Sequence, residues 1–183
     1  MFVFINMVIE VEAKVSISKL DDLRAKLRKI TRFIGREKKA DDYYTLQNLA
    51  GYPTKSLRVR ARKNYHEVNF KQPLSYSNGV WAKNEVEFKI HDLNGFFELL
   101  NEFGFRKWLR KEKQTELYKS GNVGIEINKV KGLGWFMEVE YLCNKKNIAK
   151  ARKKVVDVLK KLNINKKDIE KSGYTKMLWK KMH

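Results

Sequence analysis

The chain has 183 residues, with 40 Lys and Arg against 21 Asp and Glu, and a formal net charge of +19. Its length suits one domain spanning 1–183, no segment approaches the roughly 18 uninterrupted apolar residues of a membrane span, and the single Cys143 excludes an internal disulfide framework and a cysteine-based zinc site. We therefore expect a cytoplasmic protein with no membrane partner and with an anionic ligand, whose identity the charge alone does not give.

The first predicted elements are a strand and a helix. Residues from Phe2 to Val15 contain an apolar run without a basic leader, and their second half alternates apolar and polar positions, which predicts a strand rather than an export signal. Ser18 is a candidate N-cap for the next segment. A helix there would place four apolar residues on one face: Leu20, Leu23, Leu27 and Ile30.

The remaining chain predicts more strands than helices. Asp92 is expected to cap a helix through DLNGFFELLNEF, and two helices are expected near Asn147–Leu162 and Ser172–Lys181. Further strands are predicted at Phe33–Tyr44, Leu57–Lys63, His66–Lys71, Lys83–Ile90, Arg106–Tyr118, Val123–Val130 and Trp135–Leu142. About eight strands favour an α+β fold dominated by antiparallel β-structure, in which a closed or nearly closed eight-stranded barrel carries helices on its outside.

Charged residues recur at every second position of several predicted strands. In VIEVEAKV, Glu10, Glu12 and Lys14 share one face, while the other face is apolar. The same spacing places together Arg58, Arg60 and Arg62, then Glu85, Glu87 and Lys89, and finally Glu138 and Glu140. Each such face alone is compatible with the solvated side of a sheet. Their recurrence favours a polar lumen, in which carboxylates face a metal and cations face phosphate.

The segment IEVEAK resembles the E-x-E-x-K signature of the CYTH superfamily, also called triphosphate tunnel metalloenzymes. Other segments resemble family motifs in the same order, from Glu10 to Leu178: KKADDYY, LRVR, FKQP, KNEVEF, FGFRKWLRKEKQTELY, NKVKGLGWFMEVE and SGYTKML. The set is most similar to the branch of class IV adenylyl cyclases and thiamine triphosphatases. This resemblance implies an eight-stranded antiparallel tunnel, a triphosphate-containing substrate, and Mg or Mn as the cofactor.

We assign site residues on this basis. Phosphate oxygens would be bound by Lys14, Arg58, Arg60, Lys71 and Lys113. The metal would be held by Glu10, Glu12, Glu138 and Glu140, with Glu85, Glu87 and Asn128 as further candidates, and catalysis would depend on Glu10, Glu12 and Lys14.

Two positions depart from the family pattern. Thr115 stands where the family commonly has Arg, and Asn128 stands where it commonly has Asp. Thr cannot offer a guanidinium fork to phosphate, and Asn can neither carry charge nor act as a base. We expect these replacements to weaken catalysis more than binding.

The resulting hypothesis is a metal-dependent enzyme that hydrolyses or cyclises a nucleoside triphosphate, another organic triphosphate or tripolyphosphate. One alternative is a noncatalytic nucleotide- or polyphosphate-binding protein of the same fold. Another is a basic nucleic-acid-binding protein, which would use exposed aromatic residues for base stacking. We do not favour it, because the four Trp residues are scattered along the chain. The oligomeric state stays open, and a homodimer is one option.

Overall fold

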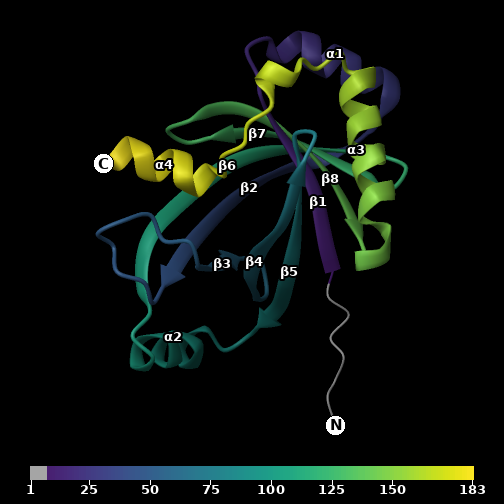
Figure 1. Cartoon of the computed structure of the whole chain (residues 1–183). Coiled ribbons are helices and arrows are strands. Elements are labelled where there is room, and N and C mark those ends of the chain that lie inside the picture. Colours follow the sequence, from purple (N-terminus) through teal and green to yellow (C-terminus); the bar gives the residue numbers. More distant parts are fainter. Residues whose placement is uncertain (1–7) are drawn as a thin grey trace.

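Eight antiparallel strands form a closed barrel in the computed structural model, which describes residues 8–183 (Figure 1). The predicted strand-dominated α+β barrel is therefore confirmed, whereas positions 2–7 of the first predicted strand lie outside the described residues. The strands are β1 (Val8–Ser16), β2 (Arg32–Thr45), β3 (Leu57–Ala61), β4 (His66–Ser77), β5 (Val80–Ile90), β6 (Arg106–Ser120), β7 (Val123–Val130) and β8 (Gly134–Cys143). They are arranged in the order β1-β5-β4-β3-β2-β6-β7-β8, and β8 pairs again with β1.

Four α-helices accompany the barrel in the described part of the chain. They are α1 (Leu20–Ile30), α2 (Leu93–Glu102), α3 (Ile148–Lys161) and α4 (Tyr174–Met182), with short 3₁₀ turns at Lys145–Asn147 and Lys166–Asp168. Between positions 8 and 183, none of the helices combines the length and the apolar character needed to cross a bilayer.

The two predicted helix caps have different outcomes. Asp92 caps α2 as predicted, because its side chain accepts a hydrogen bond from the backbone N–H of Gly95. The assignment of Ser18 as the cap of α1 is wrong. That helix begins at Leu20, and Lys19 occupies its N-cap position without a capping hydrogen bond from its side chain to any described residue.

The hairpin of β4 and β5 is longer than predicted. The predicted strand was His66–Lys71, and Pro73, just beyond it, cannot donate a hydrogen bond to a sheet ladder. The strand nevertheless continues to Ser77, since the pairing with β5 shifts register between Pro73 and Ser75. Asn78 and Gly79 then adopt φ values of 53° and 81°, and two consecutive positive φ values suit a tight hairpin turn.

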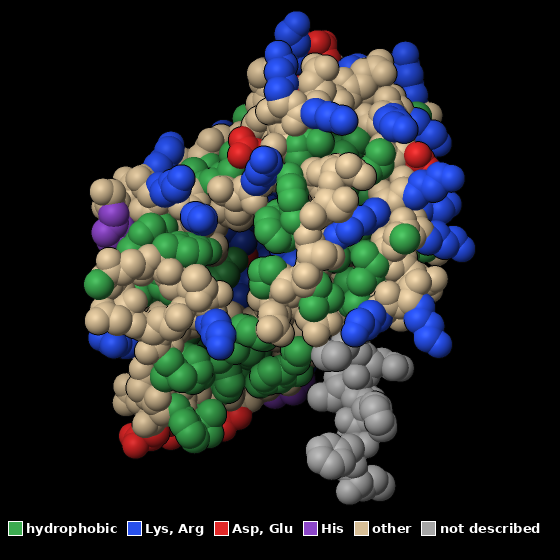
Figure 2. Space-filling view, in the orientation of Figure 1, with side chains coloured by type: hydrophobic (Ala, Val, Ile, Leu, Met, Phe, Trp, Pro, Cys, Tyr) green, Lys and Arg blue, Asp and Glu red, His purple; other side chains and the backbone are tan. Residues whose placement is uncertain are grey.

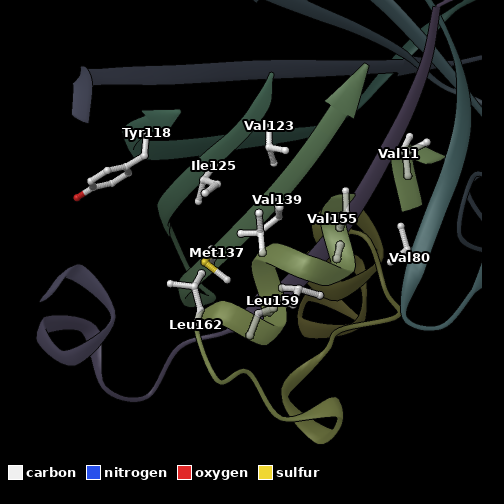
Figure 3. Close-up of a cluster of buried hydrophobic side chains, with 14 of the residues drawn as sticks. Val11, Val80, Tyr118, Val123, Ile125, Met137, Val139, Val155, Leu159 and Leu162 are labelled. Atoms are coloured by element: carbon white, nitrogen blue, oxygen red, sulfur yellow. The ribbon is translucent and has the colours of Figure 1, made fainter. Parts of the chain in front are cut away.

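The main hydrophobic core lies outside the barrel wall. Outward-facing residues of β1, β5, β7 and β8 pack under α1 and α3. Figure 3 shows Met137 and Val139 of β8 on the same side as α3, which carries Val155. Val11, Ile127, Met137, Val139 and Val155 are each fully buried there. Because the apolar faces of β1, β5, β7 and β8 are packed outside, their opposite, charged faces point into the barrel.

A second, smaller apolar cluster anchors α4. It contains Val130, Phe136 and Tyr174, and the ring of Phe136 meets that of Tyr174 edge to face at 5.2 Å between centroids. A hydrogen bond of 2.8 Å between the hydroxyls of Tyr52 and Thr175 ties the same helix to the loop after β2. These contacts fix Tyr174 beside the inner face of the barrel.

Candidate active site in the barrel lumen

The charged faces of the strands meet in one enclosed space. Glu10, Glu12 and Lys14 are only 3%, 7% and 6% exposed. Lys71 of β4 donates a hydrogen bond to Glu10, and Lys14 forms an ion pair of 3.4 Å with Glu138 of β8. Figure 2 shows a hollow near the centre of one face, with atoms of Lys and Arg on its floor. The lumen is therefore polar, as the alternation of charge predicts.

Asp41 on β2 is the most deeply buried carboxylate of the lumen. It accepts two hydrogen bonds from the guanidinium of Arg60 and lies 2.9 Å from Nζ of Lys111. Burial alone would raise the pKa of Asp41, but Lys111 and Arg60 outweigh burial and hold the pKa well below its usual value. At Lys111 burial outweighs the neighbouring charge instead. It lowers the pKa of Lys111 to about 8, although Asp41 acts to raise it.

Lys113 on β6 links two further carboxylates. Its Nζ lies 2.8 Å from Glu126 and 3.4 Å from Glu138, and Lys39 of β2 approaches Glu126 to 2.7 Å. Burial would raise the pKa of both acids, yet Lys113 first and then a second Lys lower each pKa to about 2. Glu126 and Glu138 therefore stay ionised in the lumen near neutral pH, beside the charged Lys113.

Thr115 and Asn128 are partners across neighbouring strands. They stand opposite each other in the pairing of β6 with β7, and the Thr115 hydroxyl donates a hydrogen bond of 2.6 Å to the Asn128 side-chain oxygen. The Asn128 amide donates in turn to Glu138 at 2.9 Å. The two departures from the family pattern thus form one neutral, hydrogen-bonded unit, and neither leaves an unpaired charge.

The lumen becomes more exposed toward the end formed by β3, β4 and β5. The Arg58 side chain is 12% exposed and contacts Glu67 at 2.6 Å and Glu87 at 3.3 Å, while the Glu87 side chain is 45% exposed. Glu85 accepts a hydrogen bond from Asn69 and lies 3.3 Å from Lys71. Of the predicted candidates, Glu87 is thus the least enclosed.

Comparison with known proteins identifies this arrangement. The pattern of the CYTH domain family matches residues 8–174, which is nearly the whole described chain. The chain belongs to the CYTH family. A protein of Methanocaldococcus jannaschii named "Putative adenylate cyclase MJ0240" is 28% identical over 172 residues, which cover 92% of this chain and 98% of that protein.

Solved structures show the same CYTH fold. The PH1819 protein of Pyrococcus horikoshii superposes with a TM-score of 0.79 at 28% identity, covering 94% of this chain and 99% of that one. A Hippeastrum protein, described as an adenylyl cyclase candidate with a dominant triphosphatase activity, has a TM-score of 0.60 at 17% identity and covers 94% of both chains. At that identity the second likeness shows the fold alone.

The carboxylates of this CYTH lumen suit a hard divalent cation in their chemistry. One oxygen of Glu10, Oε2, is buried without a hydrogen-bond partner in the described structure, and burial followed by the charge of Glu12 raises the pKa of Glu10. Burial, then Glu10 and Glu126, raise the pKa of Glu140 to about 8. A bound cation would relieve this excess of negative charge. Within residues 8–183, however, no three Asp, Glu, His or Cys side chains are already grouped around a metal position.

All of the residues assigned from the sequence lie on lumen-facing positions, but several lumen residues were missed. Lys39, Lys111 and Glu126 received no role, although they are as buried or as closely paired as the assigned ones. For Lys39 and Lys111 the cause is that β2 and β6 carry charge on both faces, so alternation does not reveal which face is inside. Glu126 lies on β7, where alternation with Val123, Ile125 and Ile127 could have identified it. The spacing of two between Lys111 and Lys113 could have shown that they share a face.

A concavity of about 880 Å³, here called the outer concavity, is lined by β2, β6, β7 and the turn before β8. Its lining contains Lys39 and Lys113 of the lumen as well as outward-facing residues of the same strands. Its rim includes the exposed cations Lys38, Lys129 and Lys131. Glu112, a carboxylate in its lining, is already held by Lys131 at 2.9 Å and by Arg110 at 3.2 Å. Because these charges face solvent, we regard the lumen, with its buried ionised groups, as the candidate active site.

Proposed function

We propose that the CYTH barrel is a metal-dependent enzyme that holds the triphosphate of a nucleotide, of another organic triphosphate or of tripolyphosphate in its lumen. Family membership supports a triphosphate-binding enzyme in general. The observation that carries the proposal is the set of buried or half-buried Lys and Arg side chains that point into one space from five strands. They are Lys14 of β1, Arg58 and Arg60 of β3, Lys71 of β4, Lys39 of β2, and Lys111 and Lys113 of β6.

Binding would exchange one set of ion pairs for another. Lys14, Lys71 and Lys113 form ion pairs with Glu138, Glu10 and Glu126, respectively. A triphosphate carries several negative charges and can replace these carboxylates as the partner of the cations. The displaced carboxylates would then be free to bind a cation, which couples phosphate binding to metal binding.

The proposed metal ligands are Glu10, Glu12, Glu138 and Glu140. Mg or Mn, when bound, would neutralise phosphate oxygens and favour nucleophilic attack at phosphorus. Lys14 would stabilise the charge that develops on the transferred group, because its Nζ is fixed in advance in a buried site.

The same cradle is compatible with two reactions. In hydrolysis, water attacks the terminal phosphorus, the bond to the bridging oxygen breaks, and phosphate is released. In cyclisation, the ribose 3′ hydroxyl attacks the α phosphorus, loses its proton, and pyrophosphate leaves. The name of the Methanocaldococcus relative is consistent with the second reaction.

A substrate panel distinguishes these outcomes. ATP, thiamine triphosphate and tripolyphosphate are each incubated with Mg or Mn, and phosphate, pyrophosphate and cyclic AMP are quantified. Glu12→Gln and Lys14→Ala should reduce turnover by at least about 100-fold, because each removes a charge aimed at the reacting groups. Turnover that survives both substitutions would place the activity elsewhere or in a contaminant.

The neutral pair of Thr115 and Asn128 favours a second candidate, a noncatalytic triphosphate-binding protein. Neither side chain can supply a guanidinium or a base to the lumen. Tight binding of tripolyphosphate with no product in the panel would support this candidate over the enzyme.

A further inference from the structure

Tyr174 is the first residue of α4, and its side chain reaches the least exposed part of the lumen. The residue is 5% exposed and packs on Val130 and Phe136. Its ring centroid lies 4.0 Å from Nζ of Lys14, while Nζ of Lys111 and of Lys113 lie 5.6 and 6.0 Å away. One aromatic ring from outside the barrel thus stands among three of the lumen cations.

The hydroxyl of Tyr174 is buried beside the side chain of Asn128, but with residues 8–183 it makes no hydrogen bond of acceptable geometry. A buried hydroxyl without a partner destabilises a fold, because it has lost its hydrogen bonds to water. Phe at this position would keep the packing and avoid that loss, so the hydroxyl has no evident structural use.

The surroundings of this hydroxyl are suited to an anion with acceptor oxygens. Lys14 and Lys113 are two of the proposed phosphate ligands, and both lie against the same ring. A phenol is neutral near neutral pH, because its ordinary pKa is about 10, and its O–H can donate a hydrogen bond to a phosphate oxygen.

We propose that Tyr174 donates a hydrogen bond to an oxygen of the bound triphosphate and positions Lys14, Lys111 and Lys113 around it, which makes α4 part of the phosphate site. This inference rests on the proposed function, because it requires a triphosphate in the lumen. The C-terminal helix would then contribute to affinity directly, beyond covering the barrel.

Tyr174→Phe and Tyr52→Phe form a matched pair for the test. Each substitution removes one hydroxyl at the docking site of α4, but only the Tyr52 hydroxyl has a partner, Thr175 at 2.8 Å. Tripolyphosphate binding is measured by calorimetry, and thermal unfolding is measured without ligand.

For Tyr174→Phe we expect an unchanged or raised Tm and a Kd increased by about tenfold or more, as for the loss of a hydrogen bond to a charged group. For Tyr52→Phe we expect a Tm lowered by about 2 to 4 °C and an unchanged Kd.

The opposite outcomes are separable. If the unsubstituted protein binds tripolyphosphate and Tyr174→Phe binds it equally well, the role of Tyr174 is refuted and the proposed function stands. A lowered Tm that accompanies weaker binding in Tyr174→Phe would also refute it, since that result describes a structural residue. If the unsubstituted protein binds none of tripolyphosphate, ATP and thiamine triphosphate, both proposals fail.

Discussion

The inner and outer faces of β8 stabilise the barrel by different means. Met137 and Val139 point outward and are fully buried in the apolar core, whereas Glu138 and Glu140 point inward among charges. Apolar burial stabilises whatever the neighbour is, while a buried charge is tolerated only with its partner. The outer face therefore maintains the fold, and the inner face holds charges that depend on their partners.

The largest effect should come from removing the carboxylate at the centre of the buried charges. Asp41→Asn leaves Arg60 and Lys111 without their shared anion, and we expect a loss of roughly 3 to 5 kcal/mol in the free energy of unfolding. Urea unfolding measures this loss of stability.

The adjacent Asp42→Asn is the control, because Asp42 faces outward and pairs with Arg110 and Lys107, which are about half exposed. Asp42→Asn should lower the free energy of unfolding by less than about 1 kcal/mol. Equal losses would contradict the distinction between the two faces.

A cavity in the outer core should reduce stability and leave binding unchanged. Met137→Ala should cost roughly 2 to 5 kcal/mol, because Met137 is fully buried under the helices. The Kd for tripolyphosphate, measured well below the unfolding temperature, should equal that of the unsubstituted protein. A Kd that rises as much as in a lumen variant would show that the two faces are not independent.

The charge of Lys111 should make stability depend on pH in a defined direction. Its pKa is about 8 in the folded protein, below the ordinary 10.5, so the unfolded chain binds more protons between these values. Stability should therefore rise with pH from about 8 to 10.5. Relative to Lys111→Met, which lacks this proton, the unsubstituted protein should gain on the order of 1 to 3 kcal/mol over that range, without metal or phosphate. Parallel pH curves of the two proteins would contradict the burial of a charged Lys111.

The smallest effect is expected in the outer concavity. Lys131→Met removes an exposed cation that pairs with Glu112, so neither Tm nor the Kd for tripolyphosphate should change measurably. A tenfold weaker Kd in this variant would instead indicate that the outer concavity binds the phosphate.

Alternation of residue type predicted the lumen well where one face of a strand is apolar. In β1 and β8, the apolar positions beside Glu10 and Glu138 show which face is buried in the core, so the charged face is identified by elimination. In β2 and β6 the same rule fails, because Asp41 and Asp42 are adjacent acids on opposite faces. Pairing across strands decides between them, and that pairing is a property of the folded barrel.

Two features of the site depend on contacts between distant segments. The hydrogen bond between Thr115 and Asn128 appears only when β6 and β7 are in register, so the sequence suggests two separate losses where the structure has one matched pair. Tyr174 enters the lumen only because α4 docks on Phe136 and Tyr52. Neither contact follows from local periodicity.

The most direct test of a triphosphate site in the lumen is a crystal structure determined with tripolyphosphate and Mn, with the metal located by anomalous scattering. The account predicts phosphate oxygens against Lys14, Arg58 and Lys113, and the metal against carboxylates that include Glu10 or Glu140. Tripolyphosphate bound only in the outer concavity beside Lys131, with the ion pairs of the lumen intact, would contradict it.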